Sequence, residues 1–237
     1  REEPAPEPRR CRPAGLAAGK DGSLFAVSGT TIVRLDAATG RATPLVAEGL
    51  SAPWGLALDA DARLYVADCG DAINRVGLDG HLVERFPLEP PGSIVDSRTF
   101  AVLTDTLYFF ARTSAAKTIL LALPMKSGAK VAPVPLRLPE RTHDHVSYCL
   151  APQPLDGQLV LALQPKTERD DRIDVCLIHS ANGELKQAFS LPGSSPQGIA
   201  VDAARRLIYL GGHFGLYVGG ETHGAVSAIT AVHPDGR

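Results

Sequence analysis

The sequence predicts an all-β fold, a β-propeller of about five four-stranded blades, on the basis of three observations. A glycine-ended turn recurs along the chain, with its glycines 40, 48, 55 and 53 residues apart. The same order of short segments rich in Val, Ile, Leu and Tyr precedes each turn. None of these segments has the length or the 3.6-residue periodicity of a helix. A strand-only repeat of this length is typical of blades packed around an axis.

The recurring turns divide the chain into units. They end at Gly40, Gly80, Gly128, Gly183 and Gly236, residues that tolerate the positive φ of tight hairpins. A single four-stranded sheet cannot bury both of its faces, so we expect the units to pack radially on one another. A β-sandwich is the alternative, but its strands need not share an ordered internal repeat. After a proline-rich tail or linker at 1–12, the propeller covers 13–237, with units at approximately 13–51, 52–92, 93–141, 142–194 and 195–237.

Each predicted strand is a short apolar run bounded by Gly, Asp or Pro. The second unit is the most regular, with segments at 55–59, 64–68, 73–76 and 82–86. The other units give, in order, 23–27 and 31–35 in the first; 107–110, 119–121 and 134–136 in the third; 159–161 and 173–178 in the fourth; 198–202, 207–209 and 226–232 in the fifth.

Part of this repeat resembles a known family. The second unit reads Pro-Trp-Gly-Leu-Ala-Leu-Asp over 53–59 and Leu-Tyr-Val-Ala-Asp over 64–68, which resembles the NHL repeat. The fifth unit is similar over 196–202 but has Gly212 where the second has Asp68. The resemblance implies a propeller, commonly six-bladed, in a family that includes binding modules and some enzymes. The fifth unit ends just after its turn, so we expect it to lack a fourth strand within 1–237; an incomplete six-bladed ring is therefore the alternative to a five-bladed one.

Composition narrows the classes of partner. Lys and Arg number 24 against 26 Asp and Glu, so the chain has no basic surplus for binding a nucleic-acid backbone. No apolar run approaches the roughly 18 residues that span a bilayer, so we expect no membrane insertion. The sequence does not determine the cellular location, and we slightly favour an extracytoplasmic one. The four cysteines, Cys11, Cys69, Cys149 and Cys176, show no zinc-like spacing, and a disulfide between any two of them stays open.

The two faces of the predicted propeller differ in regularity. The tight glycine-ended turns join third to fourth strands and lie on one face. The loops between second and third strands, and the connections between blades, lie on the other face and vary in length. Variable loops on a fixed scaffold are where binding sites usually lie. We therefore predict ligand or partner contacts at Trp54, Arg112, Lys166, His213, Phe214 and Tyr217.

A metal site on the same face is a second hypothesis. His143 and His145 flank Asp144, and alternate residues of an extended segment point to one side. A transition metal needs a third ligand, for which His213 or His223 are the candidates. A solvated polar loop explains the same residues without a metal. The glycine-rich segment 211–224 is either a recognition lid or a long β-hairpin extension.

Two functions follow from these patterns. The first is a binding, scaffold or sensor module for a protein or small-molecule ligand, without a cofactor. The alternative is a metal-assisted hydrolase or lyase, with a divalent transition metal at the mouth of the central channel. No GxSxG or HExxH motif occurs, so we favour the binding module. Calcium is not predicted, because Asp59, Asp68 and Asp202 are too few ligands, and we expect Asp59 and Asp202 to cap turns.

Overall fold

The structure is a computed structural model. It describes residues 15–19, 22–46, 49–50, 53–59, 61–68, 70–95, 100–115, 118–134, 148–151, 154–164, 172–179, 184–192, 194–218 and 221–235. Within these ranges, only the backbone is described for 148–149, 194–195, 197, 212–218 and 221–228. No helix in this part of the chain is long and apolar enough to cross a membrane.

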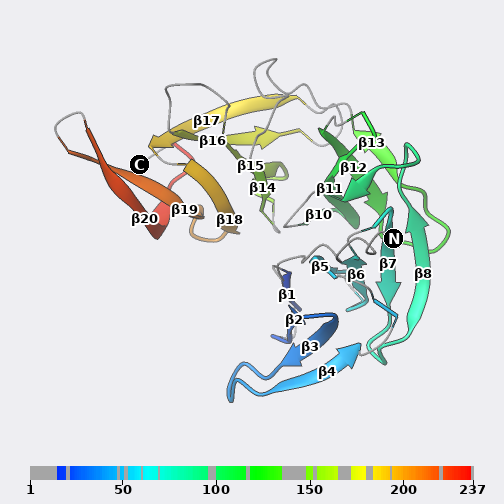
Figure 1. The fold of residues 1–237 in the computed structure, drawn as a ribbon. Helices are drawn as coiled ribbons and strands as arrows, with labels where there is room; N and C mark the ends of the chain where they lie inside the picture. Colours follow the sequence, from blue (N-terminus) through cyan, green and yellow to red (C-terminus); the bar gives the residue numbers. More distant parts are fainter. Residues whose placement is uncertain are drawn as a thin grey trace, which may run out of the picture.

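Five antiparallel sheets follow one another along the chain (Figure 1). The first contains β1 (Leu16–Ala18), β2 (Leu24–Ser28), β3 (Thr31–Leu35) and β4 (Ala42–Val46). The second contains β5 (Gly55–Leu58), β6 (Leu64–Ala67), β7 (Ala72–Val76) and β8 (Leu82–Pro87). The third contains β9 (Ile94–Val95), β10 (Ala101–Leu103), β11 (Thr106–Arg112), β12 (Thr118–Pro124) and β13 (Ala132–Val134).

The last two sheets complete the series. The fourth contains β14 (Tyr148–Leu150), β15 (Leu159–Leu163), β16 (Arg172–Ile178) and β17 (Leu185–Pro192). The fifth contains β18 (Ser194–Asp202), β19 (Leu207–Val218) and β20 (Glu221–Val232). The prediction of five blades is confirmed. The strand count differs from four in two of them, because β9 adds a short strand to the third sheet and the fifth has three strands in the described part of the chain.

The sheets stand around a central axis in an arc. The first strands, β1, β5, β10, β14 and β18, lie on the inner side of the arc, and the later strands of each sheet lie progressively outward (Figure 1). Since neighbouring strands are antiparallel, connections alternate between the two faces of the arc, as the sequence predicted. The tight turns between third and fourth strands have the expected positive φ, for example 69° at Gly40 and 85° at Gly80.

Apolar side chains on both faces of the central strands hold the sheets together. On β6, Leu64 and Val66 pack toward the first sheet, whereas Tyr65 and Ala67 pack toward the third. This alternation explains why the strand reads as an uninterrupted apolar run: both of its faces are buried. Separate clusters of buried residues join the first sheet to the second, the second to the third, the third to the fourth and the fourth to the fifth.

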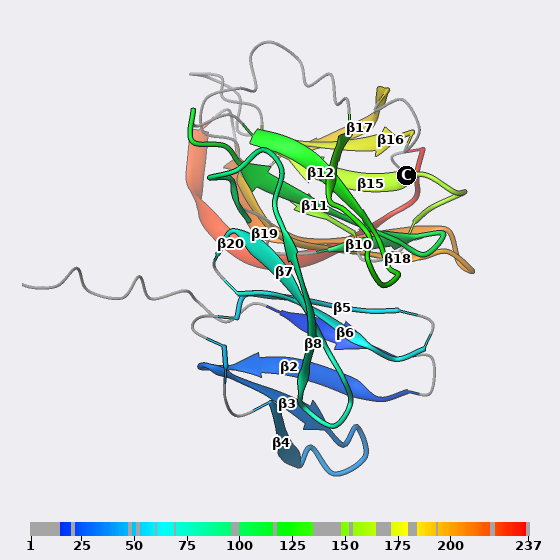
Figure 2. The ribbon, with the colours of Figure 1, turned by 90° about the vertical axis from the view of Figure 1, so that its right-hand side faces the viewer.

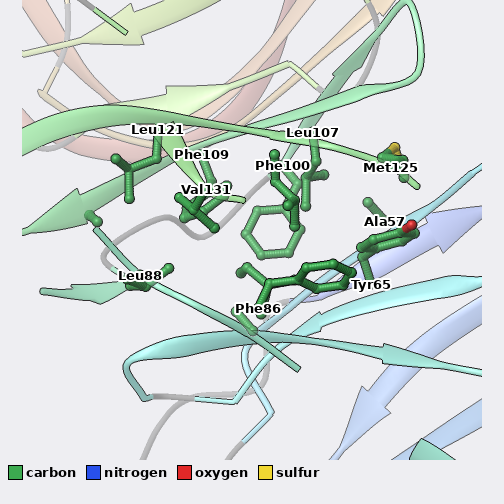
Figure 3. Packing of buried hydrophobic residues seen from close by; sticks show 14 residues of the cluster. Ala57, Tyr65, Phe86, Leu88, Phe100, Leu107, Phe109, Leu121, Met125 and Val131 are labelled. Carbon is green, nitrogen blue, oxygen red and sulfur yellow. The ribbon is translucent and has the colours of Figure 1, made fainter. Parts of the chain in front are cut away.

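The cluster between the second and third sheets is rich in aromatic rings (Figure 3). Tyr65 and Phe86 stack with their ring centroids 6.0 Å apart. Phe100 and Phe109 meet at a tilted angle, with centroids 5.7 Å apart. Such pairs stabilise an interface by more than the area that they bury, so these rings strengthen the contact between the second and third sheets.

Of the two interpretations of the glycine-rich segment 211–224, the long β-hairpin extension is confirmed for its described residues, 211–218 and 221–224. The backbone of β19 pairs with β20 from Ile208 opposite Val232 out to Val218 opposite Glu221, with a register shift between Gly215 and Tyr217. The segment is therefore a long hairpin extension of the fifth sheet. A glycine without a side chain does not prevent ladder pairing, and β-branched or apolar residues flank the glycines on both strands.

Candidate functional site

The best-defined part of the irregular face lies where the second and third sheets meet. We call it the rim and define it by Trp54, Gly70, Asp71, Ile94–Val95 and Arg112. Trp54 immediately precedes β5, and its backbone N–H donates to the carbonyl of Ala67 at 2.7 Å. This bond prolongs the β5–β6 ladder by one residue and fixes the tryptophan at the end of the sheet, beside the β6–β7 connection.

Strand β9 connects the two sheets at this face. The backbone N–H of Val95 donates to the carbonyl of Gly70 at 3.3 Å, which ties β9 to the β6–β7 connection. On its other side, β9 pairs with the end of β11, Val95 opposite Ala111 and Ile94 opposite Arg112. Strand β9 thus lies between the β6–β7 connection, beside which Trp54 is fixed, and the end of β11, which carries Arg112.

The Trp54 side chain is half-buried and packs, together with Val95, against the aromatic cluster between the two sheets. Its indole Nε1 is buried and has no hydrogen-bond partner among the described residues. A buried N–H group without a partner in the protein is uncommon and costs free energy unless water or a ligand accepts its hydrogen bond. The indole N–H is therefore a buried donor at the rim that the described residues leave unsatisfied.

The rim carries charges of both signs. Asp71 accepts a hydrogen bond from the guanidinium of Arg85 at 2.5 Å, and its carbonyl accepts one from the N–H of Leu88 at 2.7 Å. Arg112 is exposed at the end of β11. A donor indole and an arginine on one face suit an acceptor-rich or anionic group on a ligand.

Trp54 and Arg112 are the two predicted site residues whose side chains are described, and β9 lies between the segments that carry them. Packing between blades, the alternative interpretation of Trp54, is confirmed, whereas its contact with a ligand stays a prediction. His213, Phe214 and Tyr217 lie on β19 and His223 on β20, where only the backbone is described. Lys166, His143 and His145 lie outside the described residues, and so their predicted roles stay predictions.

The backbone of the β19–β20 hairpin shows how far apart two of the proposed metal ligands, His213 and His223, lie along the ladder. His213 is opposite Ser227, and Tyr217 is opposite Thr222, the neighbour of His223. The two histidines of the hairpin are therefore not on one rung of the ladder. Among the residues whose side chains are described, no group of three His, Cys, Asp or Glu side chains could hold a metal ion.

The aspartates considered for calcium are structural where they are described. The Asp59 carboxylate accepts hydrogen bonds from the N–H groups of Asp61 and Arg63, both at 2.9 Å. The Asp202 carboxylate accepts one from the N–H of Arg205 at 2.9 Å. Both hold the turn that follows them, as predicted, on the face opposite the rim.

Sequence reasoning missed β9 and the pairing of Asp71 with Arg85. The signal for β9 was available: the apolar pair Ile94–Val95 follows a cluster of prolines and a glycine, as the start of a strand does. Its two-residue length hid it among the connections. The ion pair had no local signal, because Asp71 and Arg85 are 14 residues apart and the sequence does not give the register of β7 and β8 that brings them together.

Comparison with known proteins shows the fold of this chain but does not show its function. No protein-family model and no curated protein matches the sequence. Among solved structures, a gluconolactonase from Xanthomonas campestris is 17% identical with a TM-score of 0.63, covering 95% of this chain and 73% of its own. Virginiamycin B lyase from Staphylococcus aureus is 17% identical with a TM-score of 0.56, covering 87% and 64%.

A binding protein also occurs among these structures. The nidogen/laminin complex contains a chain that is 18% identical with a TM-score of 0.55, covering 85% of this chain and 72% of its own. Identities this low are evidence of a shared architecture, and that architecture serves both enzymes and binding proteins. This chain is a β-propeller of five blades.

Proposed function

We propose that the protein is a binding module whose ligand contacts the rim. The observation that carries this proposal is the buried Nε1 of Trp54, which has no acceptor among the described residues. A ligand oxygen at that position would satisfy the donor and relieve its desolvation cost.

The ligand class follows from the same residues. A carboxylate-bearing ligand with additional hydroxyl or carbonyl oxygens would offer an acceptor oxygen to the indole and place a negative charge beside the exposed Arg112. Sugar acids and short acidic peptides have this chemistry. Aromatic and arginine side chains dominate binding energy in many interfaces, so Trp54 and Arg112 are expected to be the anchors.

Trp54 provides its own assay, because it is the only tryptophan in the chain. Intrinsic fluorescence should therefore report on the rim alone when the protein is titrated with gluconate and with short peptides ending in Asp or Glu. We expect a saturable change in emission with at least one of these probes. Binding detected by calorimetry without any change in Trp54 emission would contradict the proposed site, and no binding by any probe would contradict the ligand class.

The metal-assisted hydrolase or lyase is the alternative. It depends on His143, His145 and His223, whose side chains lie outside the described part of the structure. Elemental analysis of the purified protein separates the two functions. A stoichiometric transition metal that is lost on His143→Ala would favour the enzyme over the binding module.

A further inference from the structure

The interface between the second and third sheets contains a row of polar side chains. Figure 2 shows the second sheet, β5–β8, between the first sheet and the third. Tyr65 on β6 lies opposite Arg75 on β7, and Arg75 lies opposite Glu84 on β8, so the three side chains are neighbours on the face toward the third sheet. Tyr65 is 0% exposed and Arg75 is 5% exposed. A cationic side chain is thus buried between two sheets whose facing side chains are mostly apolar.

The guanidinium of Arg75 is only partly satisfied. Its Nη2 pairs with the Glu84 carboxylate at 2.8 Å, the one ion pair that Arg75 makes within the described part of the chain. Its Nε and Nη1 are buried and have no hydrogen-bond partner among the described residues. Buried arginines normally direct their planar set of donors at acceptors, often two at a time. Two donor nitrogens of a buried cation are therefore left without an acceptor.

The hydroxyl of Tyr65 is also buried, and no described residue accepts or donates a hydrogen bond to it. Burial raises the pKa of this hydroxyl and the Arg75 guanidinium opposes the rise, so the two groups are close although no aligned hydrogen bond joins them. Phe86 holds both in place. Its ring stacks on that of Tyr65 with centroids 6.0 Å apart, and the Arg75 Cζ lies 5.9 Å from its centroid.

Glu84 does not serve Arg75 alone. Its carboxylate also accepts hydrogen bonds from the N–H of Gly128 at 2.8 Å and from the hydroxyl of Ser127 at 3.2 Å. It is therefore shared between the guanidinium and an exposed turn, and it reaches the guanidinium through one nitrogen only. The third sheet and its turn contribute apolar side chains to this cluster, among them Leu123 and Met125, and these carry no acceptor oxygen.

We propose that the unsatisfied donors of Tyr65 and Arg75 bind one small monovalent anion, a halide ion, between the second and third sheets. A buried cation requires a compensating charge, and a halide supplies it without needing an acceptor in return. A water molecule must direct its own hydrogens at acceptors, which the apolar side chains of the third sheet do not offer. Attraction between the ion and the guanidinium is also stronger in a buried site than in water. The stability of the folded chain then depends on halide concentration.

Bromide is the probe, and urea unfolding of the full chain followed by Trp54 emission is the measurement. Sodium bromide replaces sodium sulfate at constant ionic strength. Because sulfate strengthens apolar burial in general, this exchange by itself destabilises a fold, and a stabilisation by bromide indicates binding to the folded chain. At a fixed urea concentration within the transition, we expect about 200 mM bromide to lower the unfolding equilibrium constant at least about fivefold, the value of 1 + [Br⁻]/Kd for a Kd of about 50 mM.

Three variants locate the effect. Tyr65→Phe removes one hydroxyl and keeps the ring, and we expect it to reduce the bromide effect to less than about twofold. Arg75→Met removes the charge and should abolish the effect. Tyr108→Phe is the matched control, because Tyr108 is also buried but packs between the third and fourth sheets, and it should keep the fivefold effect. Bromine anomalous diffraction from crystals grown in bromide should place the ion within hydrogen-bond distance of the Tyr65 hydroxyl.

The proposal is overturned if the unfolding constant of the original chain does not fall with bromide, since the donors then bind no halide. It is also overturned if Tyr65→Phe responds as strongly as Tyr108→Phe, or if no anomalous peak lies between Tyr65 and Arg75, because bromide then acts elsewhere. If Arg75→Met does not fold, the comparison of the two tyrosine variants still decides the question.

Discussion

At the scale of single residues, the same type of side chain has different roles according to its surroundings. Asp59 and Asp202 close turns, and Asp71 pairs with Arg85 at the rim. The turn role is predictable from sequence, because an aspartate before a tight turn hydrogen-bonds the backbone two or three residues later. The role of Trp54 was only half predictable: its position at a blade entrance can be read from the repeat, but its unpartnered Nε1 depends on packing between two sheets.

Cys176 shows how burial controls reactivity. It lies on β16, is 2% exposed and is a free thiol. Burial, with a smaller contribution from the negative charge of Asp174, raises the pKa of its thiol to about 12. We expect Cys176 to resist iodoacetamide at pH near 8 in the native protein and to react once the protein is unfolded in urea, as measured by peptide mass spectrometry. Native labelling as fast as in urea would contradict its buried position.

Asp36 gives a pH dependence with a definite sign. Its carboxylate accepts hydrogen bonds from the N–H groups of Thr39 at 3.0 Å and Ala38 at 2.9 Å, and these bonds lower the pKa of Asp36 below 3.8. A lowered folded-state pKa stabilises the protein above the unfolded value, and this stability is lost as the pH falls through the folded value. Asp36→Asn should therefore lose less stability than the original protein between about pH 5 and about pH 3 in urea unfolding. An equal loss in the two proteins would show that this carboxylate contributes nothing.

At the scale of the elements, strands were predictable from their apolar runs, whereas their ends and the hairpin were not. The segments 64–68 and 73–76 match β6 and β7 closely, because strands buried on both faces are apolar throughout. The extension formed by β19 and β20 was left open between lid and hairpin, since its glycines weaken any local signal. The pairing between β19 and β20 shows that the segment is a hairpin. Such pairing depends on residues that are far apart in sequence, so the local sequence does not predict it.

Two glycines at equivalent positions of inner strands give a matched pair of substitutions. A Cβ on Gly55 would lie 3.1 Å from the ring of Phe100, which is buried in the interface between the second and third sheets. A Cβ on Gly198 would meet nothing within 4 Å. Neither has positive φ, so the difference is steric. We expect Gly55→Ala to destabilise the protein by about 1–3 kcal/mol and Gly198→Ala by less than about 0.5 kcal/mol in urea unfolding. Equal effects would contradict the packing of Phe100 on β5.

Glu84 links the second sheet to the third. It pairs with Arg75 at 2.8 Å and accepts hydrogen bonds from the N–H of Gly128 at 2.8 Å and the hydroxyl of Ser127 at 3.2 Å. The Arg75 guanidinium is buried and lies over the ring of Phe86, with its Cζ 5.9 Å from the ring centroid.

Glu84→Ala leaves the buried Arg75 without its carboxylate partner, so we expect a loss of about 2–3 kcal/mol in the free energy of unfolding. Arg85→Ala, which breaks the exposed pair with Asp71, is the control and should cost less than about 1 kcal/mol. Adding Arg75→Met to Glu84→Ala should recover part of the loss, because no unpaired charge then stays buried. A double variant less stable than Glu84→Ala would contradict this explanation.

At the scale of the whole molecule, the repeat in the sequence was enough to predict five sheets around an axis. The repeat could not predict how the arc ends, because the apolar faces of the first and fifth sheets have the same composition as those that are buried. The difference between the two faces of the propeller was also predictable, since regular turns and irregular connections must alternate in antiparallel sheets. Which part of the irregular face gathers polar groups depended on β9, whose pairing with β11 only the structure gives.

We expect a ligand to bind at the rim and not on the face of tight turns. Calorimetry with a probe that changes Trp54 emission tests it most directly, using four variants of the full chain. Trp54→Phe and Arg112→Ala alter the rim, whereas Asp79→Ala and Arg205→Ala alter turns on the opposite face. We expect binding to be at least about tenfold weaker, or about 1.4 kcal/mol, for each rim variant and to change by less than about twofold for each turn variant. Equal weakening by Asp79→Ala and Arg205→Ala would contradict it.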